Sequence, residues 1–137
     1  MQTVSIKKPR ESDLVRACLQ YFKAERILAW RSQSGMMFGE HAGKKRAVRM
    51  GIPGVPDIVA LLPDACVFLI ECKRPGKKQN PNQKWFEEAA LNAGHLYWVV
   101  DNLKFVIETV EAHKLLAREW ARYPDPPLNL KRKKAKP

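Results

Sequence analysis

The hydrophobic pattern of the chain predicts a central β-hairpin. Two continuous apolar runs, at 58–62 and 66–70, are separated only by the polar segment 63–65. Short apolar runs with such a break between them are typical of antiparallel strands joined by a three-residue loop. In that arrangement Leu62 pairs with Cys66 across the loop.

The residues before this hairpin predict a helix, a strand and a long loop. Between residues 11 and 25, apolar side chains recur at the spacing of an amphipathic helix. Residues 27–31 predict a short strand. The stretch 33–55 contains five glycines and four lysines or arginines, and we expect a long loop that wraps a phosphate backbone. A solvated loop without a function is the alternative.

The residues after the hairpin predict a helix followed by a parallel strand. Asn80 suits the capping position of this helix, with Pro81 and Gln83 in its first turn, and Gly94 suits its end. Residues 96–100 predict the next strand, and the order strand, helix, strand favours a parallel crossover. Five residues at helical spacing are expected to form the buried face of the helix: Trp85, Phe86, Ala89, Ala90 and Ala93.

The last part of the chain leaves two possibilities open. Residues 105–107 form either a short strand or part of a helix that runs to about Trp120. A cluster of prolines then ends the ordered domain, which is expected to span residues 1–124. The tail at 125–137 is rich in lysine and arginine, and we expect it to be disordered and to add salt-sensitive affinity for nucleic acid.

The chain is strongly basic. Its 137 residues are enough for one domain with one core. The 25 Lys and Arg residues against 14 Asp and Glu give a formal net charge of +11. This bias favours a polyanionic partner, nucleic acid first. A cationic protein without such a partner is the alternative.

The odd number of cysteines and the short length of the apolar runs favour a cytoplasmic protein. The three cysteines lie in apolar stretches and their number is odd, which favours reduced thiols. No Cys-x-x-Cys spacing occurs and the three histidines are scattered, so a zinc site is not expected. No apolar run approaches the roughly 20 residues of a membrane span, and charged residues near the start argue against a signal peptide. No membrane partner is expected.

Charged side chains converge at the open end of the predicted hairpin. Its register places Asp57 opposite Glu71, and strand alternation puts Lys73 on the same face. Two like charges at cross-strand distance are destabilising unless a cation lies between them. Carboxylate oxygens suit Mg²⁺, with the Cys72 carbonyl as a further ligand, and Lys73 could activate water or counter charge on a phosphate. A two-residue turn would instead place Asp57 opposite Ile70.

These motifs resemble those of a nuclease superfamily. The pattern Gly54-x-Pro56-Asp57, followed by Glu71-x-Lys73 at a strand end, is similar to that of the PD-(D/E)xK nucleases. More narrowly, most of the chain resembles the VRR-NUC family, the virus-type replication-repair nucleases. The resemblance implies a single α/β domain with a restriction-endonuclease-like mixed β-sheet flanked by helices. It also implies cleavage of DNA with Mg²⁺ or Mn²⁺.

The resemblance assigns roles to four residues of the hairpin end. Asp57 and Glu71 correspond to metal-binding acids, and the main-chain oxygen of Cys72 to a further metal ligand. Lys73 corresponds to the catalytic lysine.

Two further site residues are implied by the same resemblance. Glu11 corresponds to a catalytic, metal-binding acid that the first helix lends to the site, with Asp13 as the alternative. Gln83 corresponds to a catalytic-site residue beside the acids. Its other interpretation is a side chain that only caps its own helix.

Stand-alone members of this family resemble Holliday-junction resolvases that act as homodimers. The resemblance therefore favours branched DNA as substrate, a homodimer, and a bacterial or phage-infected cell. The alternatives are a non-catalytic nucleic-acid-binding module and a nuclease that acts on flaps or on a duplex sequence. The basic residues expected to contact DNA are Arg31, Lys44, Lys45, Arg46, Arg49, Lys77 and Lys78.

Overall fold

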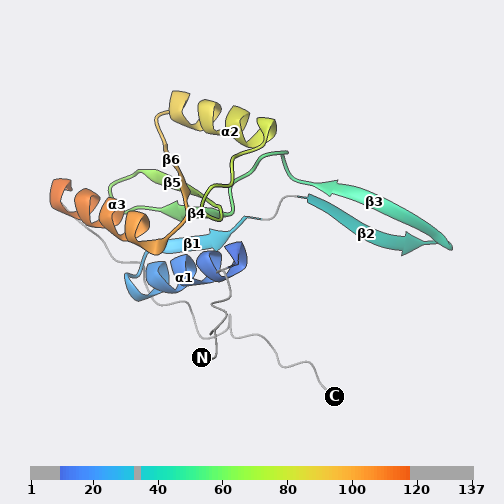
Figure 1. Cartoon of the computed structure of the whole chain (residues 1–137), viewed down its shortest axis with the longest axis horizontal. Helices are drawn as coiled ribbons and strands as arrows, with labels where there is room; N and C mark the ends of the chain where they lie inside the picture. Colours follow the sequence, from blue (N-terminus) through green and yellow to red (C-terminus); the bar gives the residue numbers. More distant parts are fainter. Residues whose placement is uncertain (1–9, 33–34, 118–137) are drawn as a thin grey trace, which may run out of the picture.

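The computed structural model describes residues 10–32 and 35–117. The elements are α1 (Glu11–Ala24), β1 (Leu28–Arg31), β2 (Gly35–His41), β3 (Lys44–Met50), β4 (Ile58–Leu61), β5 (Val67–Cys72), α2 (Pro81–Asn92), β6 (Leu96–Val100) and α3 (Leu103–Leu116). A four-stranded sheet of order β1-β4-β5-β6 forms the centre. Helices α1 and α3 pack on one face and α2 on the other (Figure 1). The predicted mixed sheet flanked by helices is therefore confirmed.

The β4–β5 hairpin has the predicted register. Ile58 pairs with Ile70, and the N–H of Leu62 donates to the Cys66 carbonyl at 2.9 Å. The three-residue loop ends on Ala65, whose φ of 66° lies in the left-handed region that such loops use. The alternative two-residue turn is therefore excluded. Strand β6 runs parallel to β5, as the crossover through α2 predicted.

The larger core lies between the sheet and the pair α1 and α3. Val15, Cys18 and Phe22 form the buried face of α1. The Phe22 ring meets Phe68 of β5 edge to face, with ring centroids 6.3 Å apart. Because these contacts fix α1 along the sheet, they also determine where its first turn lies relative to the end of β5.

The segment expected to be a long loop is mostly a second hairpin, which we call the arm (β2 and β3). His41 pairs with Lys44, and the two-residue turn at Ala42 and Gly43 has positive φ at both positions, 52° and 74°. The arm projects from the body, and among the described elements its strands pack only against each other (Figure 1). The loop prediction was wrong because strands that pack only against each other need no regular alternation of apolar and polar residues.

Helix α2 buries less surface than predicted. Ala90 is buried, but Trp85 is 58% exposed. The helix rests on Leu69 and Tyr97, over the edge strand β6, so most of its circumference faces solvent. Of the other three residues predicted for the buried face, Phe86 is partly buried, and Ala89 and Ala93 are exposed.

A helix follows the last strand of the sheet. Residues 105–107 belong to α3, which decides between the two possibilities in favour of the helix, and Val106 and Val110 are buried. Helix α3 ends at Leu116, before the predicted end near Trp120, because Ala117 is extended with a ψ of 134°. The predicted domain end at 124 and the tail 125–137 lie outside the described residues. Within the described ranges, no helix has the length and apolarity needed to cross a membrane.

Candidate active site

Two carboxylates meet at the open end of the β4–β5 hairpin. Asp57 directly precedes β4, and Glu71 lies near the end of β5. The Asp57 Oδ2 atom accepts the backbone N–H of Cys72 at 2.8 Å, so its side chain reaches the neighbouring strand. The N–H of Ser32 donates to the Asp57 carbonyl at 2.8 Å. Hydrogen bonds from both neighbouring strands therefore hold Asp57 in place.

Glu71 is the buried charged residue of the described structure, with 3% of its surface exposed. Its Oε1 atom accepts a hydrogen bond from Gln83 Nε2 at 2.7 Å and lies 3.4 Å from Lys73 Nζ. Its Oε2 atom is buried and has no hydrogen-bond partner among the described residues. An unpartnered buried carboxylate oxygen costs free energy, which a bound cation would offset. The donor set and this oxygen both fit a metal ion.

Both carboxylates have raised pKa values. Burial is the main reason that the pKa of Glu71 rises to about 7, and the negative charge of Asp57 adds to the rise while Lys73 opposes it. Burial also raises the pKa of Asp57, against the Cys72 N–H and two nearby cations. Two buried acids that repel each other bind a divalent cation in preference to remaining ionised alone.

The first helix brings one of its two candidate acids to this site. Glu11 Oε1 accepts the backbone N–H of Arg74 at 3.3 Å, directly after Lys73. Asp13 instead accepts the N–H of Arg10 at 3.3 Å and so caps its own helix. Of the two alternatives, the structure places Glu11 beside the end of β5.

Gln83 caps its own helix and also contacts Glu71. Its Oε1 atom accepts the N–H of Asn80 at 2.9 Å, while Asn80 accepts the N–H of Gln83 at 2.9 Å, which is a capping box. Its Nε2 atom is then left to donate to Glu71. The start of α2 thus orients the side chain that holds the buried acid.

Gly54 joins the loop before Asp57 to the start of α2. Its φ is +83°, and a Cβ at this position would lie 2.2 Å from the carbonyl oxygen of Asn82. Only glycine permits such a close approach of backbone to backbone. The loop and the first turn of α2, which carries Gln83, are therefore packed together.

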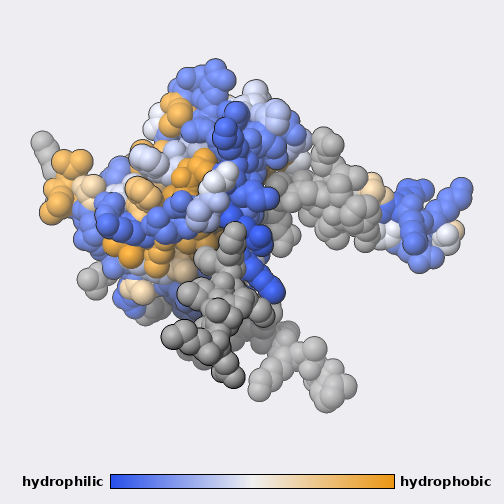
Figure 2. Space-filling view, in the orientation of Figure 1, coloured by the Kyte–Doolittle hydropathy of each residue, from blue (hydrophilic) through white to orange (hydrophobic). Residues whose placement is uncertain are grey.

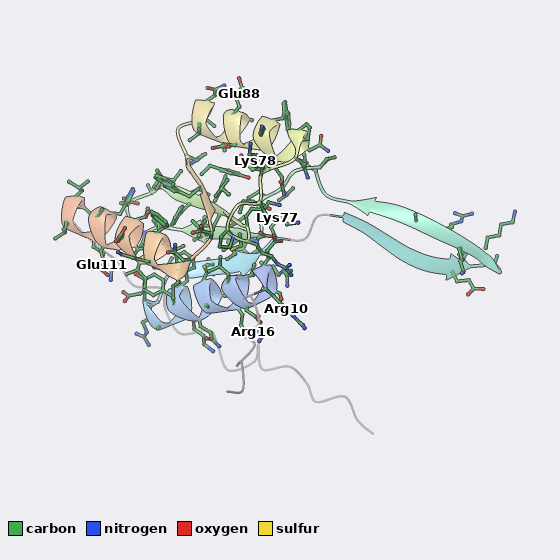
Figure 3. All side chains as sticks on the ribbon, viewed as in Figure 1. Arg10, Arg16, Lys77, Lys78, Glu88 and Glu111 are labelled. Atoms are coloured by element: carbon green, nitrogen blue, oxygen red, sulfur yellow. The ribbon has the colours of Figure 1, made fainter. Side chains whose placement is uncertain are left out.

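The basic residues predicted to contact DNA fall into two groups. Arg31 lies in β1 and is exposed, and Lys77 and Lys78 are exposed in the loop between β5 and α2, on the side of the body from which the arm extends (Figure 3). Lys44, Lys45 and Arg46 are exposed at the tip of the arm, whose described surface is largely hydrophilic (Figure 2). Arg49 belongs to β3, but its side chain lies outside the described part.

Two features of the structure could not be predicted from the sequence. The partners of Asp57 and Glu11 are backbone N–H groups of Cys72 and Arg74, which any residue type would supply. The second feature is an apolar surface on β1 and β4, where Leu28 pairs with Leu61. Both leucines are exposed by more than a third, as is Trp30.

The raised pKa of Glu71 predicts that metal affinity depends on pH. A cation must displace the proton, so affinity for Mn²⁺ should rise about tenfold per pH unit below pH 7 and level off above it. Metal-free stability should change in the opposite direction, falling as pH rises from the usual carboxyl value near 4.5 through 7. Calorimetric titration with Mn²⁺ between pH 5.5 and 8.5 measures the affinity. Glu71→Gln should remove this dependence, and a wild-type affinity that stays constant from pH 6 to 8 would contradict it.

Comparison with known proteins gives one structural and one sequence likeness. No family model matches the chain. A solved structure described as a VRR_NUC domain superposes with a TM-score of 0.53 and 22% identity, covering 74% of this chain and 94% of the other. The phage protein "Putative nuclease p44", from Acyrthosiphon pisum secondary endosymbiont phage 1, is 36% identical over 55 residues, which are 40% of this chain and 59% of that protein. The chain therefore has the fold of a VRR_NUC domain.

Proposed function

We propose that this protein is a VRR-NUC-type, metal-dependent endodeoxyribonuclease that hydrolyses phosphodiester bonds in branched DNA, such as Holliday junctions, as a homodimer. The observation that carries the proposal is the buried Glu71, whose Oε2 atom has no partner among the described residues, next to Asp57 and Lys73. The fold of a VRR_NUC domain and the partial likeness to a phage protein named as a nuclease support it.

The metal ligands in this proposal are Asp57, Glu71, the main-chain oxygen of Cys72, and Glu11. All of them are hard oxygen donors, which suit Mg²⁺ and also Mn²⁺. Such an ion, when bound, lowers the pKa of a coordinated water and stabilises charge on the phosphate and leaving oxygen. The raised pKa values of both acids and the unpartnered oxygen support the ligand assignment.

Lys73 and Gln83 both contact the Oε1 atom of Glu71. The Lys73 side chain is 17% exposed and its ammonium faces Glu71, so it can orient an attacking water or counter charge that develops on the phosphate. Gln83 holds the Oε1 atom of Glu71, so the unpartnered Oε2 atom would be available to bind a metal ion. Both side chains are fixed before substrate binds, which reduces the reorganisation needed during the reaction.

The arm and the loop after β5 supply the contacts to DNA. Lys44, Lys45 and Arg46 are exposed at the tip of the arm, while Lys77 and Lys78 are exposed in the loop that follows the candidate acids. Phosphate contacts of this kind position a nucleic acid without reading its sequence. Two separate basic regions favour a substrate with more than one duplex segment over a single straight duplex.

The apolar surface of Leu28, Trp30 and Leu61 is the proposed contact between two copies. These residues lie on the paired strands β1 and β4, and their exposures of 36%, 45% and 40% make a continuous patch. Exposed apolar patches of neighbouring residues mark interaction surfaces. A twofold dimer brings two active sites to a four-way junction, as its symmetry requires.

The cytoplasm is the proposed compartment. Cys18, Cys66 and Cys72 are all free thiols. Even Cys18 and Cys72, which are buried in the same core cluster, are not joined by a disulfide. Persistent free thiols are characteristic of reducing compartments.

Substitution of the catalytic residues should separate cleavage from binding. Asp57→Asn and Lys73→Met should each lower the rate of junction cleavage with Mg²⁺ at least about 100-fold, because each removes a group that acts in the transition state. Binding of the same junction in EDTA should stay within about twofold of wild type. The control is Lys104→Met, which removes an exposed lysine of α3 that pairs only with Glu108. Cleavage at the wild-type rate by either variant would refute the site.

The same assay, run on equimolar four-way junction, 5′ flap, 3′ flap, duplex and single strand, tests the substrate class. Preferential cleavage of the junction is expected. Cleavage confined to flaps, or discrete fragments from plain duplex, would identify one of the alternative nucleases. Binding without products on every substrate, with Mg²⁺ and with Mn²⁺, would identify a non-catalytic module.

Removal of the charges at the arm tip should weaken DNA binding without moving the cleavage position. The triple variant Lys44→Ala, Lys45→Ala, Arg46→Ala should bind a junction less tightly. The slope of log affinity against log salt concentration should become shallower by about 2 to 3, roughly one for each phosphate that the arm no longer neutralises. Fluorescence anisotropy between 50 and 250 mM salt measures both quantities. Lys104→Ala is the control for a general decrease in positive charge. An unchanged slope would show that the arm tip does not contact phosphates.

A charge in the apolar patch should dissociate the proposed dimer. Leu28→Asp places a carboxylate in the surface that two copies would bury, so a monomer is expected in sedimentation velocity at micromolar concentration. Leu115→Asp is the matched control, because Leu115 is 87% exposed near the end of α3. The Leu115→Asp variant should remain a dimer. A monomeric wild-type protein, or a dimeric Leu28→Asp variant, would contradict the proposal.

A further inference from the structure

Three side chains with metal-binding chemistry meet at the closed end of the β4–β5 hairpin. Asp64 and Cys66 belong to the turn, and His113 lies in the last turn of α3. One possible ligand atom from each residue lies within 4.8 Å of the other two. Glu71 lies five positions after Cys66, about 16 Å further along β5, so this cluster is distinct from the candidate active site.

Hydrogen bonds already hold the cluster in shape. Asp64 Oδ1 accepts the N–H of Cys66 at 3.2 Å, while Asp64 Oδ2 contacts His113 Nδ1. The side chains of Asp64 and His113 are only 20% and 23% exposed. The Cys66 thiol has only a long contact of 3.8 Å, to the carbonyl of Val67. The sulfur is therefore available to a stronger partner on the side of Asp64 and His113.

We propose that Asp64, Cys66 and His113 form a second metal site, one that takes Zn²⁺ with water as the fourth ligand. A set of one oxygen, one nitrogen and one sulfur suits zinc better than the hard cations that carboxylates alone prefer. Tetrahedral ligands at about 2.0 to 2.3 Å from the ion lie about 3.3 to 3.8 Å apart. Asp64 Oδ2 and His113 Nδ1 would therefore move apart from direct contact when the ion binds. An ion bound here would join the end of α3 to the hairpin turn.

A simple ion pair between Asp64 and His113 is the competing explanation of this geometry. The two explanations differ in Cys66, which an ion pair does not need and a zinc site does. The other two thiols, Cys18 and Cys72, are fully buried in the core. Cys66 is thus the thiol that can report a metal at this position.

Cobalt(II) absorption on the full-length protein tests the proposal, because a cobalt–thiolate bond gives a charge-transfer band that oxygen ligands do not give. Wild-type protein should show this band at one Co²⁺ per chain, together with intense tetrahedral d–d bands. Stoichiometric Zn²⁺ should remove both. Cys66→Ser and His113→Gln should abolish the band and weaken Zn²⁺ binding by more than the 10- to 100-fold typical of indirect partners. His95→Gln is the matched control and should retain both.

Two further measurements separate this site from folding and from catalysis. Cys66→Ser is nearly isosteric, so its metal-free unfolding midpoint should match wild type, while Zn²⁺ should raise the midpoint of wild type only. Asp57→Asn should keep the cobalt–thiolate band, since its loss of function would lie at the other end of the hairpin. Absence of the band in wild type, its persistence in Cys66→Ser, or its loss in Asp57→Asn would each overturn the proposal.

Discussion

The repulsion between Asp57 and Glu71 is the constraint around which the rest of the structure is arranged. Each acid is partly or fully buried, each has a raised pKa, and the charge of Asp57 adds to the rise at Glu71. Two carboxylates that repel each other stay close together only where other interactions hold them in place. The hairpin register holds both strands, the Cys72 N–H holds one carboxylate, and Gln83 holds the other. Local free energy is thus stored at the site and offset by the core elsewhere.

The sequence predicts this constraint well because its causes are local. Leu62 and Cys66 flank a loop of only three residues, so the length of the loop determines the register and with it the position of both acids. The start of α2 is equally local, since Asn80 and Gln83 carry the capping chemistry in their side chains. Where a short stretch contains both the turn and the polar groups, prediction from pattern succeeds.

Prediction fails where the determining contact is distant or absent. The strands of the arm pack against no other described element, so no neighbouring element imposes a pattern on them. Trp85 looks like a core residue, but α2 lies over the edge of the sheet and leaves it exposed. His113 reaches Asp64 across 49 positions, a contact that only the packing of α3 creates. The family resemblance placed Glu11 near the end of β5, but no residue pattern indicates its contact with the N–H of Arg74.

The attachment of the arm has a consequence for how this fold can vary. Gly54 fixes the loop that leads to Asp57 against the start of α2, while the strands of the arm are bound only to each other among the described elements. Nothing in the described body specifies how long those strands must be. Insertions, deletions or exchanged turns in the arm would therefore leave the geometry of the acids intact. The reach of the arm and the geometry of the two acids can therefore change independently.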